Sequence, residues 1–282
     1  MNNKFIHIRI LIKIKRLIKS IIPNKLIEKY KGHKLKEKSK HFVGNDVYCP
    51  ICESEFRMFG PTGLGKKEFG VVGIGARQNA QCFKCGSAER DRLLFKYLTE
   101  ELHLLEIKEN LRLLHFAPDE PFYHLFSKNK YIEYYPCDID PLIYPFIGNT
   151  KIRKVDITSI PFDNNYFDFI ICNHVLEHVS DDKLAMSELY RVMKEGGRGY
   201  FQVPIDYNRT TTYEDNSITT PKEREIAFGQ RDHVRWYGQD YKTRLEEIGF
   251  TVHEDSFVKK FSEEELFKYG LDSLELIYSC QK

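Results

Sequence analysis

The sequence has little of several features that would assign its class at once. Its 282 residues include one tryptophan and four methionines. No run is apolar enough to cross a bilayer, which takes about 20 mainly apolar residues. There is no signal peptide, so we expect a reducing, cytoplasmic compartment and no disulfide framework. There is also no internal repeat, which excludes repeat architectures.

An excess of one charge is also missing, although the charges are unevenly distributed. The net charge is only +2, but residues 1–40 contain thirteen Lys or Arg and two Glu, which leaves −9 for the remainder. A mildly acidic body argues against a broad basic face for nucleic acid. The hydrophobic content of 41% and charged content of 30% are typical of a globular protein. We therefore expect a main domain with appendages and no nucleic-acid partner for the body.

The positive charge belongs to an N-terminal arm over residues 1–41. Within it, residues 4–22 place isoleucine and leucine on one face of a helix and basic side chains on the other, before Pro23. Two interpretations remain open. One is an amphipathic helix that lies on the anionic inner face of a membrane. The other is a helix packed on the body or on a partner. Residues 24–41 are predicted to form a Lys-rich linker.

Four of the seven cysteines form two C-x-x-C pairs, namely Cys49, Cys52, Cys82 and Cys85. Two such turns can close a tetrahedral structural zinc site. The 29 residues between the pairs exceed the usual loop of a zinc ribbon, and a redox role for C-x-x-C is the alternative. Two pairs together favour metal. We therefore predict a zinc-ribbon-like module over residues 42–92, with an architectural role.

A glycine-rich stretch between the two pairs nearly matches a nucleotide-binding P-loop. It reads GPTGLGKK over residues 60–67, with Lys67 where a Ser or Thr would hold Mg²⁺. No convincing strand precedes it. We reject the P-loop and expect hairpin turns or a mobile loop.

Residues 93–282 alternate strand-like apolar runs with helical segments, which predicts an α/β domain. Strands are expected over Tyr131–Cys137, Phe167–Cys172 and Tyr200–Ile205, and a helix over Asp181–Lys194 before Gly196 and Gly197. This order resembles the class I S-adenosylmethionine (SAM)-dependent methyltransferases. The segment CGSAER with LHFAPD, over residues 85–90 and 114–119, is similar to a bacterial subfamily with a zinc-ribbon-like segment and an LHFAPE motif. The resemblance implies a Rossmann-like, seven-stranded sheet and SAM as the cofactor.

The resemblance also implies which residues bind SAM. The family's acidic-x-G-x-G loop is altered here, because His115 takes the acidic place while Ala117 and Asp119 take glycine places. Asp138 matches the position that binds the ribose hydroxyls, and Asp156 the position that meets the adenine amino group. Asp119 is suited to the ammonium group of SAM. The full set of implied cofactor contacts is His115, Phe116, Ala117, Pro118, Asp119, Asp138, Asp156, Ile157 and Asn173.

The expected reaction is methyl transfer from SAM to a hydroxyl of a sugar or another small acceptor, and the basic arm suggests a lipid-linked one. A base must then remove the hydroxyl proton. His174, at the end of the strand Phe167–Cys172, and His233, in the block DHVRWYG, are the candidates. His178 is expected to be a scaffold residue. Two alternatives stay open: an RNA methyltransferase, because of the arm, and a non-catalytic scaffold, because of the altered loop.

Overall fold

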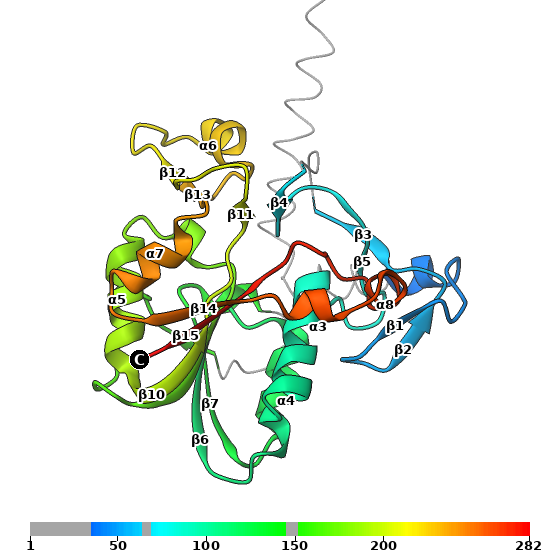
Figure 1. Ribbon diagram of the computed structural model, residues 1–282, viewed down its shortest axis with the longest axis horizontal. Helices are drawn as coiled ribbons and strands as arrows, with labels where there is room; N and C mark the ends of the chain where they lie inside the picture. Colours follow the sequence, from blue (N-terminus) through cyan, green and yellow to red (C-terminus); the bar gives the residue numbers. More distant parts are fainter. Residues whose placement is uncertain (1–34, 64–68, 145–151) are drawn as a thin grey trace, which may run out of the picture.

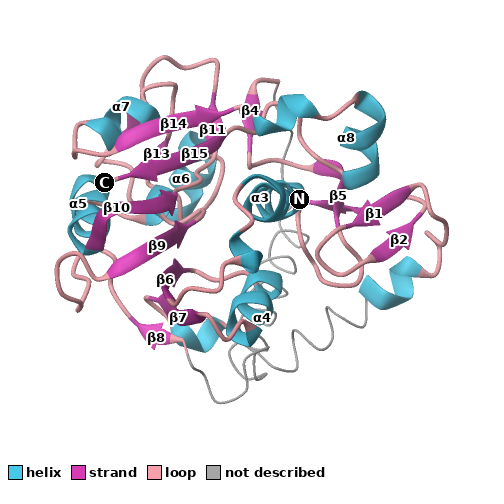
Figure 2. Ribbon diagram, turned by 60° about the horizontal axis from the view of Figure 1, so that its bottom comes forward, coloured by secondary structure: helices cyan, strands magenta, loops and turns pink. Residues whose placement is uncertain are grey.

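The computed structural model describes residues 35–63, 69–144 and 152–282 (Figures 1 and 2). The expected amphipathic helix over residues 4–22 lies outside these described residues. Within the described residues, no helix combines the length and the apolar character that crossing a membrane requires.

A seven-stranded mixed sheet forms the centre of the molecule, in the order β14-β15-β10-β9-β6-β7-β8 (Figure 2). The strands β10, β9, β6, β7 and β8 are parallel, and β15 is antiparallel to both β10 and β14. Their bounds are β6 Leu111–Phe116, β7 Ile132–Asp138, β8 Arg153–Lys154, β9 Phe167–Cys172, β10 Met193–Tyr200, β14 Thr251–Asp255 and β15 Ile277–Gln281. The sheet confirms the α/β, Rossmann-like expectation.

Both faces of the sheet are covered, because alternate side chains of each strand enter two separate cores. Along β9, Ile170 packs into one core and Ile171 into the other. Helices α5 (Asp182–Val192) and α7 (Tyr241–Glu246) cover the first face. Helices α3 (Glu89–Lys96) and α4 (Glu120–Lys128) cover the second, as Figure 1 shows. The parallel strand ends therefore emerge between two packed layers.

An N-terminal module of short strands lies beside α3 and α8 (Glu263–Tyr269) (Figure 1). It comprises β1 Val47–Cys49, β2 Ser54–Phe56, β3 Gly60–Thr62, β4 Val71–Val72 and β5 Arg77–Gln81. β1 pairs with β2 and β3 with β5, whereas β4 pairs with β11 (Ile205–Asp206), which follows β10. This last pairing joins the module to the edge of the sheet where polar side chains gather.

Arg92 of α3 fixes the module to the main domain. Its guanidinium is fully buried and donates hydrogen bonds to the carbonyls of Ser87, Ala80, Tyr269 and Gly270 at 2.6–2.9 Å. These carbonyls come from β5, the start of α3 and the end of α8. A buried charge with its donors satisfied is a strong local constraint, and it is costly to lose.

Three local details complete the description of the fold. The N-cap of α3 is Ala88, because the hydroxyl of Ser87 lies against the cysteine sulfurs. The strand expected over Tyr200–Ile205 is displaced: β10 includes Gly196 and Gly197 and ends at Tyr200, and β11 begins only at Ile205. The stretch after β11 holds β12 (Tyr213–Glu214), α6 (Pro221–Phe228) and β13 (Arg235–Trp236).

Candidate functional site

A cavity of about 760 Å³ opens at the carboxyl ends of the parallel strands. Ligands bind at this edge in open α/β sheets. Five of the predicted cofactor residues line it: Phe116, Ala117, Asp138, Asp156 and Ile157. The predicted base His174 lines it too, with His178, Tyr144 and Asp232. The structure thus gathers residues that are up to 116 positions apart along the chain.

The altered loop keeps a glycine-like backbone. Ala117 has a φ of 48°, in the left-handed region that glycine adopts without cost. Its N–H donates to the carbonyl of Cys137 at 2.9 Å, which fixes the turn against β7. The backbone at Ala117 therefore follows a path that glycine adopts readily.

Asp138 lies at the end of β7, and each of its two side-chain oxygens accepts a hydrogen bond. Its Oδ1 accepts a hydrogen bond from the N–H of Asp140 at 2.7 Å, and its Oδ2 accepts one from the Tyr144 hydroxyl at 2.5 Å. Asp140 instead caps the turn that follows, where its side chain accepts from the N–H of Leu142. Asp138 therefore faces the cavity as a hydrogen-bond acceptor, while Asp140 is a turn residue.

Asp156 also lines the cavity, just beyond β8, with Ile157 buried next to it. Its Oδ1 accepts from the backbone N–H and the hydroxyl of Thr158 at 2.9 and 2.7 Å. These two hydrogen bonds lower the pKa of the Asp156 carboxyl. The cavity thus has two acidic side chains, Asp138 and Asp156, among apolar ones such as Ile157.

The side chains of His115 and Asn173 do not line this cavity. The His115 ring is fully buried among Phe122, Phe126 and Tyr134, and burial lowers its pKa to about 3. The Asn173 side chain accepts from the N–H of Gln202 at 3.4 Å and joins the ends of β9 and β10. The alternation of side chains along β6 explains the result, because only Phe116 can face the side that holds the cavity. Any contact of His115 with cofactor is therefore limited to its backbone.

His174 is placed by an unusual backbone conformation. Its φ is 55°, and its N–H donates to the carbonyl of Gln202 at 2.7 Å. Its Nδ1 lies 3.3 Å from Oε1 of Glu177, and its buried Nε2 has no hydrogen-bond partner among the described residues. Burial, followed by the charge of Arg90, holds the pKa of His174 well below its usual value. The ring is therefore neutral near pH 7, with one nitrogen oriented by Glu177.

His233 lies behind the cavity wall. It is 2% exposed, and its ring meets that of His178 edge to face at 4.7 Å between centroids. Burial first, and then His178, lower the pKa of His233 to about 4. Of the two predicted bases, only His174 lines the cavity in the part of the chain that the structure describes.

A second cavity, of about 630 Å³, adjoins the first and shares Asp232 with it. Its walls come from the N-terminal module, the start of α3 and the segment around residues 225–232. Asp119 lines this second cavity instead of the first, and burial raises its pKa to about 7. Arg90 also lines it; its Nε lies 3.7 Å from Oδ1 of Asp91 and has no hydrogen-bond partner among the described residues. The two cavities provide separate places for two reactants.

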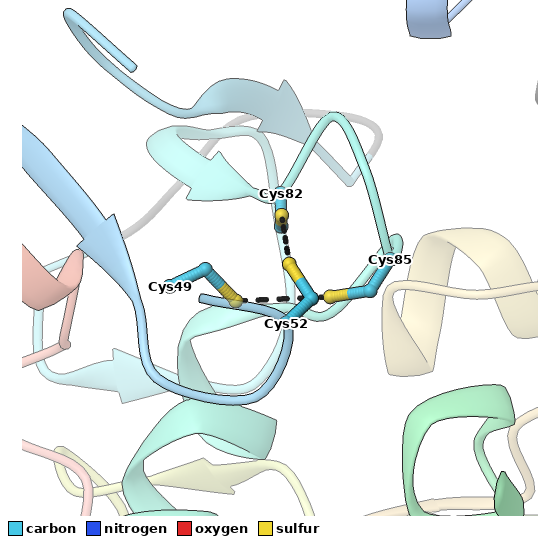
Figure 3. A group of neighbouring side chains, drawn as sticks. All are labelled: Cys49, Cys52, Cys82 and Cys85. Carbon is cyan, nitrogen blue, oxygen red and sulfur yellow. Dashed lines mark hydrogen bonds between the residues drawn. The ribbon is translucent and has the colours of Figure 1, made fainter. Parts of the chain in front are cut away.

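The four cysteines of the C-x-x-C pairs converge at one point (Figure 3). The sulfurs of Cys49 and Cys85 are 3.7 Å apart, and those of Cys52 and Cys82 are 3.6 Å apart. Sulfurs bound tetrahedrally to Zn²⁺ at about 2.3 Å would be about 3.8 Å apart. The cysteines therefore fit a four-coordinate metal with no open position.

Several further polar residues surround the predicted site residues. Arg90 and Tyr144 line the cavities, and Glu177 lies directly beneath the first one. Glu275, 3% exposed, approaches Arg90 from the other end of the chain, and its pKa is raised to about 8 by burial. The sequence offered one signal, since LEHV places Glu177 one turn after His174. No local sequence pattern indicates the roles of Arg90, Tyr144 and Glu275.

Comparison with known proteins agrees with this geometry. Residues 124–201, from α4 to the start of the segment after β10, match the family described as "Methyltransferase domain". The ubiquinone/menaquinone biosynthesis C-methyltransferase UbiE of Vibrio cholerae is 28% identical over 117 residues, which cover 37% of this chain and 45% of that protein. The chain thus spans less than half the length of this relative. The UbiE protein of Klebsiella pneumoniae is 29% identical over 100 residues.

Among solved structures, the [4+2]-cyclase SpnF is 15% identical with a TM-score of 0.47, over 70% of this chain and 83% of that one. The CurJ carbon methyltransferase is 17% identical with a TM-score of 0.43, over 67% and 53%. We assign the class from the domain match and the UbiE relatives alone. They support a SAM-dependent methyltransferase.

Proposed function

We propose that the chain binds SAM in the 760 Å³ cavity and transfers its methyl group to a small acceptor held in the adjoining 630 Å³ cavity. The observation that carries the proposal is the convergence of Asp138, Asp156 and the Ala117 turn on one cavity at the strand ends. A ribose and an adenine each need a hydrogen-bond acceptor within one pocket that also has apolar walls. Asp138 and Asp156 meet that requirement.

The acceptor side supports a polar small molecule or glycan. The second cavity is lined by Arg77, Arg90 and Arg231, together with carboxylates that include Asp119 and Asp232. Such mixed charge suits a hydroxylated compound, which offers donors and acceptors together. Methyl transfer needs the acceptor oxygen in line with the sulfonium carbon, so two adjoining cavities favour the required alignment. A base removes the hydroxyl proton as the bond forms.

His174 is the base that the geometry favours. Its unpartnered Nε2 belongs to a neutral ring in the wall of the first cavity, and Glu177 orients the ring through Nδ1. An imidazole oriented in this way can accept one proton at Nε2. The substitution His174→Asn, which tolerates a positive φ, is expected to lower kcat by about 10²-fold while S-adenosylhomocysteine still binds.

The Cys₄ group is proposed to hold a structural Zn²⁺. The support is the sulfur spacing and the closed, four-thiolate donor set. A zinc ion there would tie the turn at Cys49 and Cys52 to the start of α3, next to the second cavity. The ion would be architectural and would take no part in methyl transfer.

Carbon methylation is the second candidate. The relatives that the chain matches are named C-methyltransferases. The same base can take a proton from an acidic carbon, so the site chemistry suits either acceptor. Analysis of the product distinguishes them, because an O-methyl group and a C-methyl group give different fragments in mass spectrometry.

The test combines binding and turnover. Zinc-loaded protein is titrated with S-adenosylhomocysteine by calorimetry, and is then incubated with trideuteromethyl SAM and a panel of sugars and phenols. The proposal expects micromolar binding and a product that carries the labelled methyl group. Folded, zinc-loaded protein that binds no S-adenosylhomocysteine would contradict it and would favour a non-catalytic scaffold.

A further inference from the structure

A second group of metal-ligating side chains lies at the mouth of the cofactor cavity. It consists of Glu177 and His178, in the 3₁₀ turn Leu176–His178, and His233, in the segment before β13. One donor atom from each lies within 4.8 Å of the other two. The group is separate from the Cys₄ site, and methyl transfer as proposed above does not require it to bind a metal.

Each of the two histidine rings is oriented by contacts with neighbouring oxygen atoms. Nδ1 of His178 lies 3.3 Å from the carbonyl oxygen of Asp232 and 3.6 Å from its Oδ2. Nε2 of the same ring faces Glu177, 3.9 Å from Oε1. The His233 ring is hydrogen-bonded to the backbone of Phe228. Histidines that bind metals typically donate one ring N–H to an oxygen in this way, which frees the other nitrogen for the ion.

The carboxylate of Glu177 supports the same interpretation independently. The side chain is 2% exposed, and its Oε2 has no hydrogen-bond partner among the described residues. A buried oxygen without a partner is costly, and such an atom in a folded protein commonly indicates an ion or water. A cation between Glu177 and the two histidines would satisfy it.

The scaffold beneath these residues is rigid. The N–H of Val234 donates to the carbonyl of Glu177 at 2.9 Å. The buried guanidinium of Arg235 donates to the carbonyls of Leu176, Val179 and Ser180. The 3₁₀ turn and the segment with His233 are therefore fixed to each other, although 54 residues separate Val179 from His233. The donor group is held together before any ligand arrives.

We infer that Glu177, His178 and His233 form a binding site for a divalent transition-metal ion, with an open coordination position toward the 760 Å³ cavity. Two imidazoles and one carboxylate select Zn²⁺, Fe²⁺ or Co²⁺ over Mg²⁺ and Ca²⁺, which prefer oxygen ligands. Three protein ligands leave room for a water molecule or a substrate oxygen. His178 and Asp232 line the cavity, so the open position faces it.

Metal binding requires a small movement. Donors at about 2.1 Å from Zn²⁺ are about 3.4 Å apart in a tetrahedron, whereas these lie up to 4.8 Å apart. The His178 side chain is 34% exposed and can move inward without disturbing the core. If the proposed function holds, the open position would take an oxygen of the methyl acceptor, and this part of the inference rests on that function.

The test uses the full chain with its Cys₄ site loaded with zinc. The protein is titrated with Co²⁺ and followed by visible absorption and by calorimetry. We expect one Co²⁺ per chain, with the weak d–d bands of nitrogen and oxygen ligands. Thiolate charge-transfer bands would instead reveal exchange at the cysteines. His178→Ala and Glu177→Gln are each expected to weaken Co²⁺ binding at least 30-fold, in line with about 2 kcal/mol per lost ligand.

The matched control is His124→Ala, which removes another partly exposed histidine next to a glutamate, Glu120, on α4. It should leave Co²⁺ uptake unchanged. The inference is overturned if wild-type protein takes up no stoichiometric Co²⁺ beyond the cysteines, or if His178→Ala and Glu177→Gln bind it as well as wild type does. His178 is partly exposed, so a folded variant is expected, and its thermal unfolding curve checks this. Binding of S-adenosylhomocysteine is measured separately, so the proposed function can fail without affecting the result.

Discussion

The two cavities that share Asp232 are built from different parts of the chain. The 760 Å³ cavity is made by the ends of β6, β7 and β9, which are consecutive parallel strands of one sheet. The 630 Å³ cavity is made by the N-terminal module, α3 and the segment around residues 225–232. The first therefore follows from a repeated strand pattern, whereas the second depends on long-range packing. The difference explains why the cofactor side is easier to infer than the acceptor side.

The largest effect is expected from a substitution in the Cys₄ group, which lies in the N-terminal module beside the second cavity. Cys82→Ser removes one of four thiolates, and structural zinc contributes on the order of 10 kcal/mol to folding of such modules. We expect the protein to lose one equivalent of zinc and the melting temperature to fall by at least about 20 °C, since 1 kcal/mol corresponds to about 2–4 °C in a protein of this size. Zinc analysis and calorimetry measure both. Cys137→Ala, at a buried cysteine of β7, is the control that should keep its zinc. Full zinc content in Cys82→Ser would refute the site.

A substitution at Asp138 tests the cofactor cavity without changing the second cavity. Asp138→Ala removes an acidic side chain that lines the cavity, and hydrogen bonds to charged groups contribute about 1.5–3 kcal/mol. We expect S-adenosylhomocysteine to bind about 10- to 100-fold more weakly, as measured by calorimetry. Asp140→Ala is the matched control two residues away, because its side chain only caps the following turn. Equal losses in both variants would show that Asp138 is not the specific contact.

Asp119 lies in the second cavity, and its ionisation gives a pH test. Burial, followed by the charge of Asp91, raises the pKa of Asp119 to about 7. The carboxyl can attract the ammonium group of the cofactor only if the methionine end of SAM extends from the first cavity into the second, and only when Asp119 is ionised. The affinity for S-adenosylhomocysteine, measured by calorimetry, should then fall by about tenfold between pH 8 and pH 6, because the Asp119 carboxyl gains a proton. Asp119→Asn should bind weakly at both pH values. A variant that retains the pH dependence would assign it to another group.

The smallest expected effect concerns Tyr144. Its hydroxyl occupies one lone pair of Asp138, the residue proposed to bind the ribose. Tyr144→Phe removes this competitor, so S-adenosylhomocysteine should bind up to about fivefold more tightly, equivalent to about 1 kcal/mol. Tyr213→Phe, in β12, is a control outside both cavities. Weaker binding by Tyr144→Phe would mean that the hydroxyl contacts the ligand directly.

Part of the sheet was predictable because β9 is an apolar run of strand length bounded by turn residues. Asp138 and Asp156 were chosen from the family resemblance, and both line the strand-end cavity. The position of β10 was not predictable. Gly196 and Gly197 suggested a turn before the strand, but they lie within β10, where its register against β9 shifts between Met193 and Arg198. Glycine tolerates the positive φ of 73° at residue 196, so an irregular strand continues where the sequence suggests an end.

The contacts between polar groups beneath the cavities could not be predicted from the sequence for a different reason. Glu177 meets His233 across 56 residues, and Glu275 approaches Arg90 across 185. No periodicity or spacing connects such pairs, because the fold alone brings them together. The side-chain direction of His115 was also missed, since the motif fixes the loop but not which face of β6 each residue occupies.

Hydrogen exchange in the presence and absence of S-adenosylhomocysteine tests the central claim most directly. The account predicts protection of the backbone amides at residues 116–119, 138–140 and 156–158, around the cofactor cavity. Peptides from β1 and β2, in the N-terminal module, should exchange at unchanged rates. Protection confined to the module, or no protection at a saturating concentration, would contradict the assignment of the strand-end cavity to SAM.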